Sequence, residues 1–183
     1  FGADIDYVVA EVSTVSEGSS AVPGERVVIA AALADAVKTE AGIADWTLST
    51  PFPGRELAGV VARHPFAGQG YDFDVPALAG DFVMTDQGTG FVHIAPGHGA
   101  DDYDLGQKHG ISVPETVDAD GVYVETVPLF AGHKVMHPSG KEGDANRVVI
   151  DALGAHGGLF ATGTLVHQYP HSWRSKAPLI FRN

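Results

Sequence analysis

The chain has 183 residues, with 11 Lys and Arg against 23 Asp and Glu, which gives a formal net charge of −12. This length suits one domain with a proper core, and the absence of cysteine excludes disulfides and Cys-based zinc sites. No apolar run approaches the roughly 20 residues that cross a bilayer, and no signal-peptide pattern opens the sequence. We therefore expect no membrane partner and, by default, a cytoplasmic location.

The hydrophobic pattern predicts many short strands. Alternating and β-branched residues are typical of strands, and 23 glycines and 11 prolines favour frequent turns. In chain order, strands are predicted at Ile5–Val12, Arg26–Ala30, Trp46–Ser49, Glu56–Arg63, Asp81–Thr85, Gly90–Ala95, Val122–Glu125 and Leu159–Gln168. The segments between them include a polar loop at 15–20, a turn at Pro51–Gly54 and a loop over 65–76.

Three segments predict helices. Apolar residues at helical spacing mark residues 32–40, and Gly42 should end that helix. A second helix is predicted over 101–109, and a third over 144–156 with Val148, Val149, Ala152 and Leu153 on one face. Strands outnumber helices and do not alternate with them regularly, which favours an α+β domain over a doubly wound sheet.

The segment Gly88–Tyr103 contains the most informative pattern. Apolar Phe91–Ala95 suits a strand, and Pro96 ends it because proline has no N–H to donate. A glycine-rich turn follows and leaves backbone amides uncovered, and Asp101 and Asp102 then lie in the first turn of a helix. Orphan N–H groups and the helix dipole favour negative charge there. Such a turn can receive a polar substrate group.

The same segment closely resembles the editing domain inserted into isoleucyl-tRNA synthetases. Its Gly-Thr-Gly is shared with valyl and leucyl relatives, whereas His-x-Ala-Pro-Gly-His-Gly favours the isoleucyl member. The block Tyr169–Arg182 resembles the segment where that insertion returns to the catalytic body. His64–Phe66, Asp74–Gly80 and Gly106–Gly110 fit the pattern in the same order, so the resemblance spans most of the chain.

The resemblance implies a compact, barrel-like mixed β core with helices packed outside, formed as a single domain over 1–183, with 169–183 as the connection to the catalytic body. It implies post-transfer editing: hydrolysis of the ester of Val-tRNA(Ile). The partners would be the tRNA(Ile) 3′ end and the rest of the synthetase. Editing would need no cofactor, and ATP and Mg would serve only the catalytic domain.

The resemblance also implies that a threonine-rich segment, which forms one wall of the editing pocket, precedes the region that matches Phe1. We therefore expect the chain to be an excised piece of a larger synthetase. Weak or no deacylation is expected from these residues alone.

Asp102 and His93 are the two predicted catalytic and substrate-binding residues. Taken alone, Asp102 is a helix-start acid and His93 a half-buried strand histidine. The resemblance implies that Asp102 holds the α-ammonium group of the substrate and that His93 lines the amino-acid pocket and limits its size. Both side chains would then share one small cavity. Asp101, a candidate for the same site, is also read as a cap or a solvated neighbour.

Other candidates have equally good structural interpretations. Thr89 and Gly90 could supply a hydroxyl and backbone contacts at the pocket rim, or form a turn that needs glycine φ angles. His98 and Gly99 could approach the pocket, although a turn histidine could equally face solvent. The other histidines show no metal-binding spacing, so no metal is expected.

Two alternatives remain open from sequence. One is a valyl-type editing domain that clears Thr-tRNA(Val), and the other is a non-catalytic tRNA-docking module. The net charge of −12 should repel a polyanion, so docking would depend on the rest of a larger enzyme. Arg174 and Lys176 are candidates for contact with the tRNA acceptor end, or else belong to the return connection. Walker A, Rossmann and Gly-x-Ser-x-Gly patterns are absent, which leaves no case for an NTPase, dehydrogenase or serine hydrolase.

Overall fold

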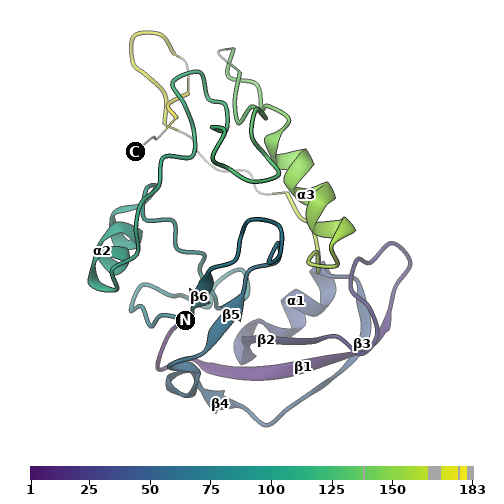
Figure 1. The fold of residues 1–183 in the computed structure, drawn as a ribbon. Coiled ribbons are helices and arrows are strands. Elements are labelled where there is room, and N and C mark those ends of the chain that lie inside the picture. Colours follow the sequence, from purple (N-terminus) through teal and green to yellow (C-terminus); the bar gives the residue numbers. More distant parts are fainter. Residues whose placement is uncertain (138, 165–169, 177, 181–183) are drawn as a thin grey trace. The chain divides into compact units, whose positions relative to one another are not determined.

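The computed structural model describes residues 1–137, 139–164, 170–176 and 178–180, and these form two compact units (Figure 1). The first unit comprises Phe1–His64, Phe73–His93 and Gly157–Gly163. The second comprises the described parts of Pro65–Asp72, Ile94–His156 and Thr164–Asn183. The single domain predicted for 1–183 and the connection predicted for 169–183 stay predictions.

The first unit is built on an antiparallel sheet. Its strands are β1 (Asp6–Val15), β2 (Arg26–Ala30), β3 (Ile43–Leu48) and β4 (Phe52–Pro53). The order is β2-β1-β3, and β4 pairs with the start of β1. Alternation along β1 buries Val8, Ala10 and Val12, while Glu11 on the opposite face forms a 2.7 Å ion pair with Arg26. These strands confirm the predictions for 5–12, 26–30 and, with an earlier start, 46–49.

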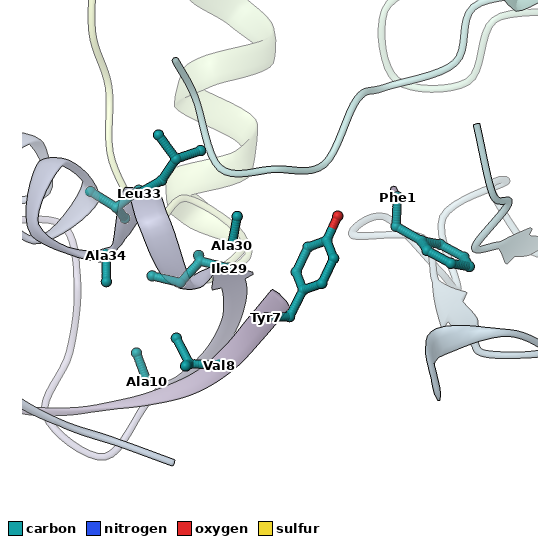
Figure 2. Close-up of a cluster of buried hydrophobic side chains, with 9 residues drawn as sticks. Phe1, Tyr7, Val8, Ala10, Ile29, Ala30, Leu33 and Ala34 are labelled. Atoms are coloured by element: carbon teal, nitrogen blue, oxygen red, sulfur yellow. The ribbon is translucent and has the colours of Figure 1, made fainter. Parts of the chain in front are cut away.

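A short helical segment covers the apolar face of this sheet. The 3₁₀ turn η1 (Ala31–Leu33) leads into α1 (Ala34–Glu40), and Gly42, with φ of +65°, follows the end of the helix as predicted. The core combines residues of β1, β2, η1 and α1 with Phe1 (Figure 2). Within it, the Tyr7 ring rises from β1 with its hydroxyl pointing away from the strand (Figure 2).

The region after β4 differs from the prediction. A 3₁₀ turn η2 (Gly54–Leu57) occupies the start of the strand predicted at 56–63, which forms only as β5 (Val61–Arg63). β5 pairs with β6 (Asp74–Pro76), inside the segment predicted as a loop. The predicted 51–54 turn contains β4. Gly54 accounts for this difference, because its N–H donates to the Ile5 carbonyl at 2.8 Å and a Cβ there would meet the Gly2 carbonyl and the Tyr7 ring.

The strands predicted at 81–85 and 90–95 are wrong. Neither segment forms a strand. Instead, the chain makes single contacts to β1 and β2: the Ala30 N–H donates to the Thr89 carbonyl at 2.8 Å, and the Tyr7 hydroxyl donates to the Gly90 carbonyl at 2.6 Å. Because these partners lie far away in sequence, local alternation could not reveal them.

The second unit contains the other two helices. α2 (Ala100–Lys108) and α3 (Ala145–Ala155) confirm the predictions at 101–109 and 144–156. The strand predicted at 122–125 is reduced to isolated bridges, Val117 with Tyr123 and Val122 with Lys134. An aromatic group centred on buried Phe66 joins the loop at 65–72 to Phe130.

The fold class is α+β, as predicted. The described strands form one four-stranded and one two-stranded antiparallel sheet rather than a closed barrel, so the barrel-like core stays a prediction. Residues 159–164 form no strand, and the rest of the strand predicted to Gln168 lies outside the described residues. Among the helices that the structure describes, none has the length and apolar character needed to cross a membrane.

The sheet core gives a direct stability test. Replacing Ile29, which is 2% exposed, by Ala should lower the free energy of unfolding by about 2–5 kcal/mol, because a cavity replaces buried methylenes. The matched Ile150→Ala change on α3, at 42% exposure, should cost less than about 1 kcal/mol. Urea unfolding followed by circular dichroism measures both, and equal losses would contradict the assignment of the core.

Candidate functional site

Backbone hydrogen bonds hold α2 at both of its ends. Gly99 is its N-cap in an extended conformation, and the Tyr103 N–H donates to the Gly99 carbonyl at 2.9 Å. At the other end, Ile111 donates to the carbonyl of Gly106 at 2.9 Å across Gly110, a glycine with φ of +68°. Gly106 also lies against the Pro96 ring, where a Cβ would approach Pro96 Cγ to 2.7 Å. The turn that precedes α2 is therefore fixed against the helix.

Of the two neighbouring acids, only Asp102 turns back toward this N-terminus. It is half-buried, and its carboxylate occupies the space that a Cβ on Gly99 would need. Asp101 is exposed to solvent. The fold thus places one carboxylate beside the orphan N–H groups of the first turn, where the helix dipole stabilises negative charge.

His93 lies in the first unit, near a second histidine. Its side chain is exposed, rather than half-buried in a strand as its sequence context suggested. His64 is half-buried and contacts the Phe73 ring with centroids 5.3 Å apart. Burial lowers the pKa of the His64 imidazole below its ordinary 6.5, and the neighbouring His93 charge lowers it further. His64 therefore favours its neutral form.

The turn at Gly88–Gly90 requires the backbone angles of glycine, which is the structural interpretation of these residues. Gly88 and Gly90 have φ of +75° and +81°, which side chains rarely adopt. A Cβ on Gly90 would also clash with the methyl group of Ala30. The exposed Thr89 hydroxyl accepts the Phe91 N–H at 3.4 Å. The predicted contacts of Thr89 and Gly90 with substrate stay predictions.

Sequence reasoning missed Tyr7, which holds this turn. Tyr7 is fully buried, and its hydroxyl joins two backbone groups, as donor to Gly90 and as acceptor from the Gly2 N–H at 3.0 Å. The available signal was a tyrosine followed by the aliphatic residues Val8, Val9 and Ala10 near the start of the strand. Buried tyrosines usually find a partner for their hydroxyl, but the pattern could not say which.

The remaining candidates are exposed. The His98 side chain faces solvent, while its N–H donates to the Ala95 carbonyl at 2.8 Å within the turn. The Arg174 guanidinium lies 4.8 Å from the centroid of the Trp173 ring, and Trp173 is 75% exposed. Lys176 has φ of +57° and donates its N–H to the Ser172 carbonyl at 2.9 Å. A cationic and aromatic surface is thus available at this turn.

The described residues hold His93 in the first unit and His98, Gly99, Asp101 and Asp102 in the second. The cavity predicted to be shared by His93 and Asp102 stays a prediction. Within the part of the chain that the structure describes, no three acidic or histidine side chains converge as a metal site requires.

Comparison with known proteins identifies the family. No family model matches the chain. It is 47% identical over 194 residues to the isoleucine–tRNA ligase of Caulobacter vibrioides, covering 100% of this chain and 20% of that protein. The ligase of Gluconobacter oxydans is 45% identical over 186 residues, again over 100% of this chain and 19% of that protein. The chain is homologous to a segment of isoleucine–tRNA ligases.

The isoleucine–tRNA ligase of Geobacillus kaustophilus matches at 43% identity over 98% of the chain and 17% of its own length. The chain therefore spans about one fifth of the length of these curated relatives. These matches confirm the isoleucyl family inferred from Gly88–Tyr103.

The burial of His64 and its closeness to His93 predict how the His64 imidazole titrates with pH. Its imidazole should titrate in the folded chain with a midpoint below 6.5, because burial and His93 both disfavour the charged form. Removing the second charge with His93→Gln should raise the midpoint part of the way, whereas His98→Gln should leave it unchanged. NMR titration of the imidazole Cε1–H signals measures these midpoints.

The lowered pKa of His64 also makes the stability of the folded chain depend on pH. Because the folded-state pKa of His64 is lowered, its contribution to stability is complete above pH 6.5 and is lost as the pH falls through the folded-state value. A titration midpoint of His64 at or above 6.5, or one that is unchanged in His93→Gln, would contradict this account.

Proposed function

We propose that this chain is the post-transfer editing domain of an isoleucine–tRNA ligase, which hydrolyses the ester bond of mischarged Val-tRNA(Ile). The observation that carries the proposal is homology to ligase segments over the whole chain, together with the glycine-rich turn and acidic helix start at Gly88–Tyr103. The activity is that of an aminoacyl-tRNA deacylase acting as proofreading within a ligase. The tRNA and the rest of the ligase are the proposed partners, in the cytoplasm.

Asp102 is proposed to bind the α-ammonium group of the aminoacyl ester. A carboxylate pairs with an ammonium through charge-assisted hydrogen bonds, which are stronger than neutral ones. Its half-buried position supports this role, because partial removal from water strengthens the attraction. A molecule without a free amine would lose this contact and be rejected.

His93 is proposed to limit the size of the amino-acid side chain. Valine and isoleucine differ by one methylene, worth only about 1–3 kcal/mol in a binding pocket, a limit for which isoleucyl enzymes are the standard example. A second pocket that admits the smaller side chain supplies the missing discrimination. The exposed imidazole of His93 is available to meet a ligand.

The proposed chemistry is attack of water on the aminoacyl carbonyl. The terminal ribose hydroxyl of the substrate helps to position or activate that water, while the protein supplies placement and dipoles for the developing oxyanion. The backbone N–H groups at the start of α2 are suited to this electrostatic role. No cofactor or metal is assigned to editing, and ATP and Mg would serve the remainder of the ligase.

The charge of the chain constrains how tRNA would be held. A net charge of −12 opposes binding of a polyanion, so most phosphate contacts would come from the rest of the ligase. Arg174 and Lys176 are proposed to contact the acceptor end. Their exposure, and that of neighbouring Trp173, supports such a contact.

Asp102 provides the main test. In the full-length ligase, Asp102→Ala should reduce deacylation of Val-tRNA(Ile) by about 10- to 100-fold, the effect of losing one hydrogen-bonded charge, and leave aminoacylation unchanged. Asp104→Ala, at an exposed position on the same helix, is the matched control and should retain deacylation. Unaltered deacylation in Asp102→Ala would favour a docking module, and faster hydrolysis of Thr-tRNA(Val) than of Val-tRNA(Ile) would favour the valyl type.

Gly99 tests the position of the Asp102 carboxylate without removing it. Gly99→Ala places a Cβ where that carboxylate lies, and the extended backbone at φ of −159° accepts alanine, so the side chain of Asp102 must move. We expect the rate of deacylation to fall by about fivefold or more, with little change in melting temperature. Gly163→Ala, which meets open space, is the control. Full deacylation by Gly99→Ala would show that this carboxylate position does not matter.

A further inference from the structure

The Tyr7 hydroxyl is bonded to backbone on both sides. It donates to the Gly90 carbonyl at 2.6 Å and accepts the Gly2 N–H at 3.0 Å, and both glycines are buried with it. Since both partners are main-chain groups, these bonds determine the path of the chain rather than the orientation of a side chain. The sequence separation of 83 positions between Tyr7 and Gly90 makes this a long-range constraint.

Two further contacts hold the same turn. The Ala30 N–H, at the end of β2, donates to the Thr89 carbonyl at 2.8 Å. The Tyr7 and Phe91 rings lie with centroids 5.1 Å apart. Three consecutive residues, 89 to 91, therefore each contact β1 or β2, and Gly90 lacks room for a Cβ beside Ala30.

This attachment ends just before His93. Residues 91–93 are exposed and form no strand, so no ladder of hydrogen bonds holds the histidine in place. The position of its backbone depends on the anchored turn two residues earlier. A shift of the turn would be transmitted to His93 over a very short length of chain.

We propose that Tyr7 is a positioning residue for the size filter: by bonding Gly90, its hydroxyl sets where His93 stands. This inference rests on the proposed editing function, in which His93 separates valyl from isoleucyl esters. Tyr7 lies inside the core and reaches the substrate only through the turn. Its loss should therefore affect selectivity more than overall activity.

The variant that tests this is Tyr7→Phe, which keeps the ring in the core and removes only the hydroxyl. Tyr71→Phe is the matched control. Tyr71 is half-buried, and its hydroxyl also donates to a backbone carbonyl, that of Pro128 at 2.9 Å, but it belongs to the second unit. Tyr7→Phe removes the two backbone hydrogen bonds to Gly90 and Gly2, whereas Tyr71→Phe removes the bond to Pro128, so Tyr7→Phe should lose somewhat more stability than the control.

Two measurements on the full-length ligase decide the outcome. Hydrogen exchange of peptides that cover 88–93 should become faster in Tyr7→Phe and stay unchanged in Tyr71→Phe. The ratio of kcat/KM for hydrolysis of Val-tRNA(Ile) to that of Ile-tRNA(Ile) should fall at least threefold in Tyr7→Phe and less than twofold in the control. Aminoacylation by both variants reports that the enzyme is folded.

Each result has one interpretation. Unchanged exchange at 88–93 overturns the anchoring role of Tyr7. Faster exchange with an unaltered valyl-to-isoleucyl ratio overturns its link to the size filter. A wild-type ligase that hydrolyses neither ester overturns the proposed function instead, and hydrogen exchange alone then still decides whether Tyr7 holds the turn.

Discussion

The first unit depends on one buried hydroxyl. Tyr7 is the second residue of the central strand and would be expected to contribute only apolar surface, yet its oxygen connects the main chain at Gly2 to the main chain at Gly90. A polar atom placed in a core is costly unless it is bonded, so the structure around it has little freedom to rearrange. Gly54 lies under the same ring and has no space for a side chain. Close packing and hydrogen bonding thus meet at a single residue.

The chain and its proposed tRNA substrate both carry net negative charge. With 23 acidic and 11 basic side chains, the chain as a whole repels tRNA, and anion recognition must depend on local groups. The start of α2 offers backbone N–H groups that carry partial positive charge irrespective of the surrounding side chains. The same excess of acid is compatible with capture of an amine. Local dipoles and one oriented carboxylate can therefore act where net charge does not help.

Much of the fold could be predicted because it depends on local pattern. β1, β2, α1, α2 and α3 follow from alternation, helical spacing and glycine at helix ends. β6 and the 81–95 segment could not be predicted, because their conformation is set by partners far along the chain, such as Ala30 for Thr89. At the site, the family motif pointed to His93 and Asp102. Which of the two neighbouring acids turns back over Gly99, and which tyrosine holds the turn, required coordinates.

The contact between Pro96 and Gly106 has a thermodynamic consequence. Because the Pro96 ring rests against Gly106 near the end of α2, the turn before the helix is packed on the helix before any ligand arrives. A cation that pairs with Asp102 then has little main-chain entropy to remove, and more of the attraction remains as affinity. A larger side chain at position 106 would push the loop away from the helix. Binding would then have to order the loop, and the loss of main-chain entropy would weaken the affinity.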